Sequence, residues 1–212
     1  MSSAISTHSH GLGYWERHAR RYDRATYVLS RRPVARMLEL AVDAARGKRH
    51  VLEVAAGTGL VTAAIAPVVG ELIATDYAAR MVEQFQARIH GAGLTNVRCE
   101  RADLAALPFG PASFDAVVAA NVLHLLPDLE QGLDCLRRVL RPGGTLIAPT
   151  YLHGETRFAR ILSRLVAITG FPIQRRFTSR SLHAAIAAAG FQIACTETIP
   201  GGFPVGFVAA RS

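Results

Sequence analysis

The chain has 212 residues, 50% of them hydrophobic, with a formal net charge of +8, which is enough for one substantial core and short for two. No stretch approaches about eighteen uninterrupted apolar residues, and the first residues lack the basic-then-apolar pattern of a signal peptide, so we expect a soluble, cytoplasmic protein. The 3 cysteines lie far apart without a Cys-x-x-Cys pair, which indicates reduced thiols and predicts no metal site.

Positive charge is concentrated at the two ends of the chain. Residues 1–50 contain 10 Lys or Arg against 4 Asp or Glu, residues 151–212 contain 7 against 2, and residues 51–150 contain 7 against 10. No acid occurs from Thr156 to Thr196. Because Lys48 is the only lysine, codon bias toward arginine can account for part of the excess, and net charge alone does not identify a function.

Short apolar runs alternate with amphipathic segments along the chain. The runs predict strands over residues 50–55, 71–76, 96–103, 113–123, 144–151, 192–199 and 203–210. Helices are predicted over residues 62–68, 78–93, 128–144 and 179–191. This alternation predicts an α/β fold with a Rossmann-like, doubly wound sheet of seven strands, mostly parallel, with helices on both faces. The Pro-Gly-Gly turn at residues 200–202 predicts that the last two strands form an antiparallel hairpin.

In such a sheet, a ligand binds outside the carboxyl ends of the strands, so the loop after the first strand is the expected site. That loop carries Glu53, Gly57 and Gly59, and glycines let a backbone approach a ligand closely. The dinucleotide pattern G-x-G-x-x-G fits poorly because Thr62 occupies its last position, and no Gly-Lys-Ser/Thr is present. A carboxylate at Glu53 would repel phosphates and would favour a ligand with an ammonium and a sulfonium group.

Residues 53–59 resemble motif I of the class I S-adenosylmethionine-dependent methyltransferases, in which an acid precedes alternating glycines. Ala55 occupies the first glycine position, as in the type 11 and quinone C-methyltransferase-like domains of this family. The segments LPFGPASFDAVV and LRRVLRPGGTL resemble the later motifs, so the resemblance extends from about His50 to Pro149. It implies S-adenosyl-L-methionine as cofactor and S-adenosyl-L-homocysteine as product.

The resemblance also implies the roles of individual residues. Asp76 ends the second strand, 23 residues after Glu53, where it would accept hydrogen bonds from the ribose diol. Tyr77 would cover the adenine face, and Asp103 would receive the adenine amino group. Taken alone, either aspartate is more often a cap or turn residue. The implied cofactor-binding residues are Tyr22, Glu53, Ala55, Gly57, Gly59, Asp76, Tyr77, Met81, Asp103, Leu104 and Asn121.

Methyl transfer is a displacement that depends mainly on holding the acceptor in line with the methyl group, and a base is needed only if the acceptor loses a proton. His124 follows the fourth strand and is the candidate base, although a structural histidine explains it equally well. Residues flanking the core are the substrate candidates: Tyr14, His18, Tyr151, His153 and Arg157. An aromatic stripe packed on the core is the alternative for Tyr14, His18 and Tyr22.

We expect a single domain in four parts: an N-terminal helical cap (1–47), a cofactor-binding core (48–150), a substrate lid (151–178), and a C-terminal helix and hairpin (179–212). In the lid, apolar residues follow helical spacing, with arginines to one side: Phe158, Ile161, Leu162, Leu165 and Val166 beside Arg157, Arg160 and Arg164. A basic amphipathic helix can rest on an anionic membrane or recognise an anionic acceptor. A solvated helix packed by its apolar face is the alternative.

A small-molecule methyltransferase with a hydrophobic or acidic acceptor is the favoured function, and a phospholipid or quinone acceptor is its more specific version. The lid lacks the C-terminal signature of the quinone enzymes, so their substrate is not carried over. RNA methylation is disfavoured because the chain lacks both a stacking platform and the Asn-Pro-Pro-Tyr or Pro-Cys signatures of base methylation. A non-catalytic cofactor-binding module is a third alternative. Oligomeric state does not follow from the sequence.

Overall fold

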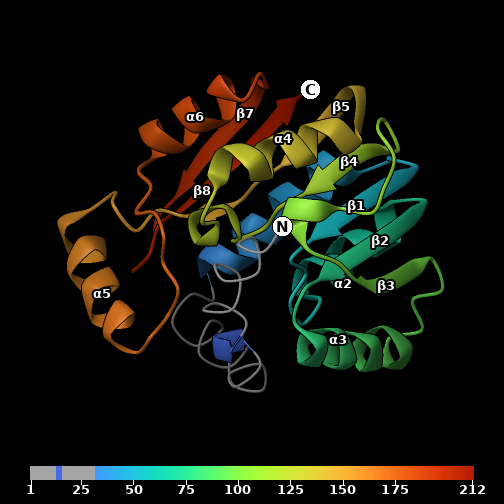
Figure 1. Cartoon of the computed structure of the whole chain (residues 1–212), viewed down its shortest axis with the longest axis horizontal. Helices are drawn as coiled ribbons and strands as arrows, with labels where there is room; N and C mark the ends of the chain where they lie inside the picture. The colour runs from blue at the N-terminus through green and yellow to red at the C-terminus, as the bar shows by residue number, and fades with distance from the viewer. Residues whose placement is uncertain (1–12, 16–31) are drawn as a thin grey trace, which may run out of the picture.

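A twisted mixed sheet forms the centre of the computed structural model, which describes residues 13–15 and 32–212 (Figure 1). Its strands are β1 (His50–Val54), β2 (Glu71–Asp76), β3 (Val97–Arg101), β4 (Phe114–Val118), β5 (Leu140–Ile147), β6 (Thr150–Tyr151), β7 (Gln192–Ile199) and β8 (Val205–Arg211). The order is β3-β2-β1-β4-β5-β8, with β7 on the other side of β8. β1 to β5 are parallel, and β8 is antiparallel to β5, β6 and β7.

This arrangement confirms the predicted fold class and the C-terminal hairpin. The eighth strand arises because the predicted fifth strand is divided into β5 and β6, with Ala148 and Pro149 between them. Proline has no backbone N–H and cannot donate within a sheet. β5 also begins at Leu140 rather than Gly144. Its first part contains the Pro-Gly-Gly sequence of residues 142–144, and the register with β4 shifts between Phe114 and Ala116, so this part of the strand is irregular.

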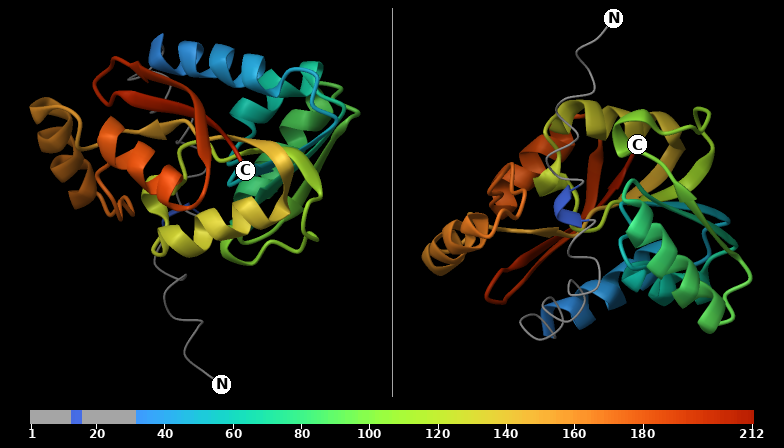
Figure 2. Two further views of the ribbon diagram at one scale, coloured as in Figure 1. Left: turned by 90° about the horizontal axis from the view of Figure 1, so that it is seen from above. Right: turned by 60° about the horizontal axis from the view of Figure 1, so that its bottom comes forward.

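Helices cover both faces of the sheet (Figure 2). Residues 32–45 are helical, and the other α-helices are α2 (Leu60–Ile65), α3 (Ala79–Gly91), α4 (Leu129–Val139), α5 (Arg157–Ile168) and α6 (Ser179–Ala188). Short 3-10 turns occupy Ala66–Val68, Leu104–Ala106 and Leu123–Leu125. No described helix is long and apolar enough to cross a membrane.

The central strands distribute alternate side chains between two cores, as a pleated sheet requires. Leu52 contributes to the core under α4 and α6, where Leu136 and Leu182 are fully buried. Its neighbour Val51 contributes to the opposite core, with the helix at 32–45 and α2. α3 closes that second face through Phe85 and Ile89. The carboxyl ends of the parallel strands are thereby fixed at one edge of the molecule.

α5 lies at the periphery, away from the sheet, in all three views (Figures 1 and 2). Thr156 caps its N-terminus by accepting a hydrogen bond from the Ala159 N–H at 3.0 Å. The helix faces the protein through small residues, because Ala159 and Ser163 are fully buried. Leu162 and Val166 are partly buried, whereas Phe158, Ile161, Leu165 and Ile168 are exposed and do not attach the helix to the fold.

Candidate cofactor and active site

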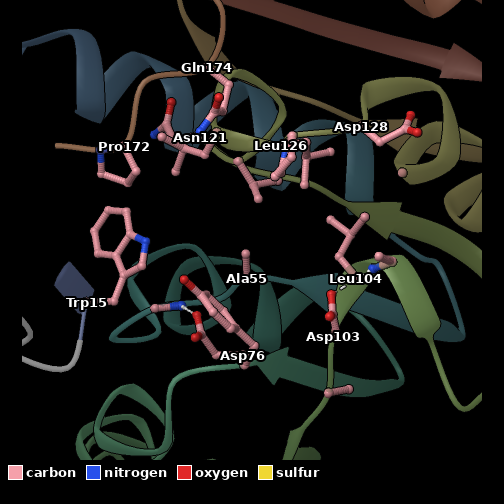
Figure 3. Close-up of a pocket in the computed structure, with 18 of the residues that line it drawn as sticks. Trp15, Ala55, Asp76, Asp103, Leu104, Asn121, Leu126, Asp128, Pro172 and Gln174 are labelled. Atoms are coloured by element: carbon pink, nitrogen blue, oxygen red, sulfur yellow. Dashed lines mark hydrogen bonds between the residues drawn. The ribbon is translucent and has the colours of Figure 1, made fainter. Parts of the chain in front are cut away.

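A cavity of about 470 Å³ lies at the carboxyl ends of the parallel strands (Figure 3). Its walls come from the loops after β1 to β4, from the start of α4, and from two further segments at Trp15 and Pro172. Figure 3 shows Asp76 and Asp103 on one side and Asn121 and Gln174 on the other. The cavity is therefore at the edge where a doubly wound sheet binds its ligand.

The loop after β1 enters the cavity in a left-handed backbone conformation. Ala55 has φ 50° and Gly57 has φ 59°, a region that glycine adopts freely and other residues adopt at a cost of about 1–2 kcal/mol. Gly57 has open space on the side where a Cβ would lie, so its backbone is accessible to a ligand. Ala55 thus keeps the conformation of the glycine that it replaces in the motif.

Gly59 serves packing rather than the cavity wall. It starts α2 with φ 81°, and a Cβ at this position would lie 2.1 Å from Cδ2 of Phe85 on α3. Phe85 is itself fully buried. The second glycine of the loop therefore lets α2 and α3 approach each other, and Gly59 is not among the residues that line the cavity.

Asp76 joins the loops that follow β1 and β2. Its two carboxylate oxygens accept hydrogen bonds from the Gly57 N–H and from the Ala78 N–H, each at 2.9 Å. The side chain is 6% exposed and lines the cavity. A carboxylate has about four acceptor sites, which suit the two hydroxyls of a diol.

Asp103 lies at the end of β3, across the cavity from Asn121. Its carboxylate caps the 3-10 turn Leu104–Ala106 by accepting a hydrogen bond from the Ala105 N–H at 2.9 Å. This bond fixes the backbone of Leu104 and Ala105 along the cavity wall. A flat ligand in this part of the cavity would meet both a carboxylate and apolar side chains.

Glu53 lies behind the cavity wall and is 1% exposed. Its carboxyl group accepts a hydrogen bond from the Thr62 hydroxyl. Burial raises the pKa of Glu53 to about 8, the Thr62 bond opposes this change, and the negative charge of Asp76 adds to it. Glu53 is consequently largely protonated at neutral pH, and a cationic ligand nearby would favour its ionised form.

A buried histidine and aromatic cluster lies next to the cavity. The rings of His124 and His153 are 4.9 Å apart, and Tyr151 lies 6.2 Å from each. Among the described residues, neither ring nitrogen of His124 or His153 has a hydrogen-bond partner. Burial holds the pKa of His124 well below its usual range, and that of His153 is lowered to about 4 by burial and by the positive charge of Arg176. Both imidazoles are therefore neutral at physiological pH.

The segment after α5 links this cluster to the cavity. The His124 carbonyl accepts hydrogen bonds from the Gln174 and Arg175 N–H groups, each at 3.0 Å. Gln174 lines the cavity, and Phe171 packs near the His124 ring at 6.4 Å. Tyr14 in turn contacts Phe171 at 5.5 Å. The cavity wall and the cluster thus share one backbone segment.

The structure separates the residues proposed from the sequence into groups. Eight cofactor candidates line the cavity: Ala55, Gly57, Asp76, Tyr77, Met81, Asp103, Leu104 and Asn121. Four others, His124, Tyr151, His153 and Tyr14, belong to the adjoining cluster. Arg157 is exposed at the start of α5 and contacts neither group. His18 and Tyr22 lie outside the described residues.

Several lining residues were not singled out from the sequence. Gln131 and Gly132 come from the first turns of α4, and Trp15, Pro172 and Gln174 come from the two flanks. The α4 residues could have been anticipated, because that helix follows the loop after β4 and starts at the same edge of the sheet. The flank residues could not, because nothing in their local sequence specifies how the flanks fold over the core.

The family model for a methyltransferase domain matches residues 52–148, which include the loops after β1 to β4. Over these residues the chain is similar to the methyltransferase-domain family. An S-adenosylmethionine-dependent methyltransferase from Thermotoga maritima has the same fold, with a TM-score of 0.76 over 94% of this chain and 98% of that chain at 19% identity.

Curated relatives match this chain over part of their length. An uncharacterised protein of Mycobacterium tuberculosis is 37% identical over 114 residues, which cover 54% of this chain and 41% of the relative. A demethylmenaquinone methyltransferase of Clavibacter sepedonicus is 39% identical over 107 residues, which cover 50% of this chain and 42% of the relative. The chain thus spans about two fifths of the length of these relatives.

The residues that line the cavity fit S-adenosylmethionine. The Asn121 Oδ1 atom is buried and has no hydrogen-bond partner in the described part of the chain, although Asn121 lines the cavity. Buried acceptors without a partner are rare in folded proteins, and an ammonium group would satisfy this one. Asp76 offers acceptors for a diol, and Leu104 and Ala105 offer an apolar wall beside Asp103 for an aromatic base.

Proposed function

We propose that this protein transfers a methyl group from S-adenosylmethionine to a small lipophilic acceptor. The observation that carries the proposal is the placement of Asp76 and Asp103 at the ends of two adjacent strands, around one cavity with a left-handed Gly57 backbone. A positively charged ligand suits the carboxylates, whereas a pyrophosphate does not.

In this proposal each part of the cavity holds one part of the cofactor. Asp76 binds the ribose diol, Asp103 and Leu104 hold the adenine, and Gly57 and Asn121 hold the amino acid end. When bound, S-adenosylmethionine supplies an electrophilic methyl group on a sulfonium. The contribution of the protein is to hold an acceptor in line with that methyl group and to exclude water, because orientation can supply much of the acceleration.

His124 is the proposed base. Its imidazole is neutral, buried and without a hydrogen-bond partner among the described residues, so it can accept a proton from an acceptor hydroxyl. The neighbouring ring of His153, 4.9 Å away, is also neutral and would not repel the imidazolium that forms. Tyr151 and Phe171 provide an apolar surround, which favours a lipophilic acceptor.

The names of relatives agree with a lipophilic acceptor. Among relatives that are at least 34% identical over half of this chain, three are named as methyltransferases of menaquinone or ubiquinone synthesis. The family model, however, ends at residue 148, before the histidine cluster is complete. A quinone-type acceptor is therefore the more specific form of the proposal, with a phospholipid as its alternative.

Methyl-labelled S-adenosylmethionine, purified protein and a total extract of small molecules and lipids would test the proposal. After partition between organic and aqueous phases, we expect protein-dependent label in the organic phase. Label confined to water-soluble products would contradict the lipophilic acceptor. No protein-dependent transfer to any product would contradict the methyltransferase activity.

His124→Asn tests the base with the labelled product as readout. We expect the turnover rate to fall by about 100-fold or more, since general-base catalysis contributes that much, with unchanged affinity for S-adenosylmethionine. His153→Asn is the matched control for loss of a buried imidazole and should retain most of the turnover. Equal turnover rates of the wild type and His124→Asn would show that His124 is a structural residue.

A further inference from the structure

The exposed face of α5 differs from the rest of the surface. Among the described residues, five large hydrophobic side chains are exposed, and four of them are on α5: Phe158 (62%), Ile161 (59%), Leu165 (57%) and Ile168 (81%). At 100° per residue these four fall within about a quarter of the helix circumference. They form one continuous apolar row on a helix whose small residues face the protein.

A row of arginines borders this apolar row on one side. Arg157, Arg160 and Arg164 are exposed and follow the same helix at spacings of three and four. In the described part of the chain, none of their side chains takes part in a hydrogen bond or ion pair. No acid occurs from Thr156 to Thr196, so the charge of this face is not compensated locally.

We infer that α5 is a membrane-docking helix, which inserts Phe158, Ile161, Leu165 and Ile168 into an anionic lipid surface while the three arginines bind lipid phosphates. An anionic lipid surface matches both the apolar row and the arginines, because it has apolar acyl chains below a layer of negative headgroups. α5 lies at the edge of the molecule (Figure 1), and none of the residues that the structure describes buries the exposed row.

The position of α5 connects this surface to the cavity. The chain leaves α5 at Ile168 and reaches Pro172 and Gln174, which line the cavity, within six residues. A docked α5 would therefore hold the mouth of the cavity close to the headgroups, where a lipophilic acceptor is concentrated. The docking itself does not depend on the proposed methyl transfer, because it rests on the exposed face of α5 alone.

Flotation of the full chain with vesicles tests the inference. We expect binding to vesicles of phosphatidylcholine with phosphatidylglycerol, with much weaker binding to phosphatidylcholine alone and a decrease at high salt. The triple variant R157Q/R160Q/R164Q should bind on the order of 100-fold more weakly, at about fivefold per arginine. The variant I161S/L165S should lose about tenfold or more, because both side chains leave the acyl region.

Matched controls separate docking from general charge and from misfolding. R46Q/R49Q/R98Q removes the same charge from exposed positions near β1 and β3 and should bind vesicles like the wild type. All variants should keep the wild-type affinity for S-adenosylmethionine in calorimetry. If that affinity is absent in every protein, the proposed function fails while the vesicle result still decides the docking.

Three outcomes would overturn the inference. Equal vesicle binding by I161S/L165S and the wild type would mean that electrostatic attraction alone is responsible. Equal loss in the control triple variant would mean that net charge is responsible. Absence of vesicle binding, together with dimers that I161S/L165S dissociates in light scattering, would assign the apolar row to a second copy of the chain.

Discussion

Glu53 and Asp76 lie at the ends of neighbouring strands and are both buried, yet they accept hydrogen bonds from different kinds of donor. The Asp76 carboxylate accepts hydrogen bonds from two backbone N–H groups. Glu53 receives one hydroxyl from Thr62, and burial raises its pKa to about 8. The negative charge of Asp76 also raises the pKa of Glu53.

The raised pKa of Glu53 predicts a pH-dependent stability. The unfolded chain releases this proton near 4.5 and the folded protein near 8, so the folded state binds more protons in between and the free energy of unfolding falls as pH rises through this window. Glu53→Gln keeps an acceptor for Thr62 and should remove this pH dependence, which amounts to a few kcal/mol at most in the free energy of unfolding. Urea unfolding of both proteins at several pH values measures it.

Comparing the wild type with Glu53→Gln also removes the contribution of the histidines to the pH dependence of stability. The lowered pKa of His153 acts in the opposite sense, since its stability contribution is present above 6.5 and is lost as pH falls toward 4. This contribution is common to the wild type and the variant and cancels in their difference. Parallel pH profiles of the two proteins would show that Glu53 ionises normally.

Asp76→Ala should weaken binding of S-adenosylmethionine by at least tenfold, because the variant loses the ribose acceptors and leaves the Gly57 N–H without its partner. The same loss should lower the free energy of unfolding by about 1–3 kcal/mol, with the fold retained. Calorimetry and urea unfolding measure the two effects. Asp43→Ala, which removes an exposed acid, is the control. Unchanged affinity of Asp76→Ala for S-adenosylmethionine would show that the ribose does not bind at Asp76.

At the scale of elements, periodicity alone predicted most helices and strands but not what they face. The apolar pattern of residues 158–166 indicated a helix, and α5 forms there, yet Phe158, Ile161 and Leu165 point to solvent. Helical spacing identifies an apolar face without identifying its partner. The subdivision of the fifth strand followed from local chemistry at Pro149, which was visible in the sequence.

The contact of α2 with α3 gives a prediction at this scale. Gly59→Ala should lower the free energy of unfolding by about 2–4 kcal/mol, since the new Cβ would overlap the Phe85 ring and the backbone has φ 81°. Gly57→Ala is the matched control, with φ 59° and open space, and should cost only about 1 kcal/mol. Equal losses in the two variants, measured by urea unfolding, would contradict a packing role for Gly59.

At the scale of the whole molecule, the sequence predicts best those cavity residues whose position follows from the strand order alone. The residues that line the cavity from Ala55 to Asn121 lie in loops after predicted strands, so topology brings them to one edge. The contributions of Trp15 and Gln174 depend on how distant segments fold over that edge, which no local pattern encodes. The same holds for the His124 and His153 contact, which joins residues from two different loops.

Equilibrium titration of the purified protein with S-adenosylhomocysteine and, separately, with a nicotinamide dinucleotide tests the central claim most directly. S-adenosylhomocysteine is stable during the titration, and Asp76 and Asp103 should accept it while repelling a pyrophosphate. We predict saturable binding of one S-adenosylhomocysteine per chain and no binding of the dinucleotide. Binding of the dinucleotide, or of neither ligand, would contradict the assignment of this cavity to S-adenosylmethionine.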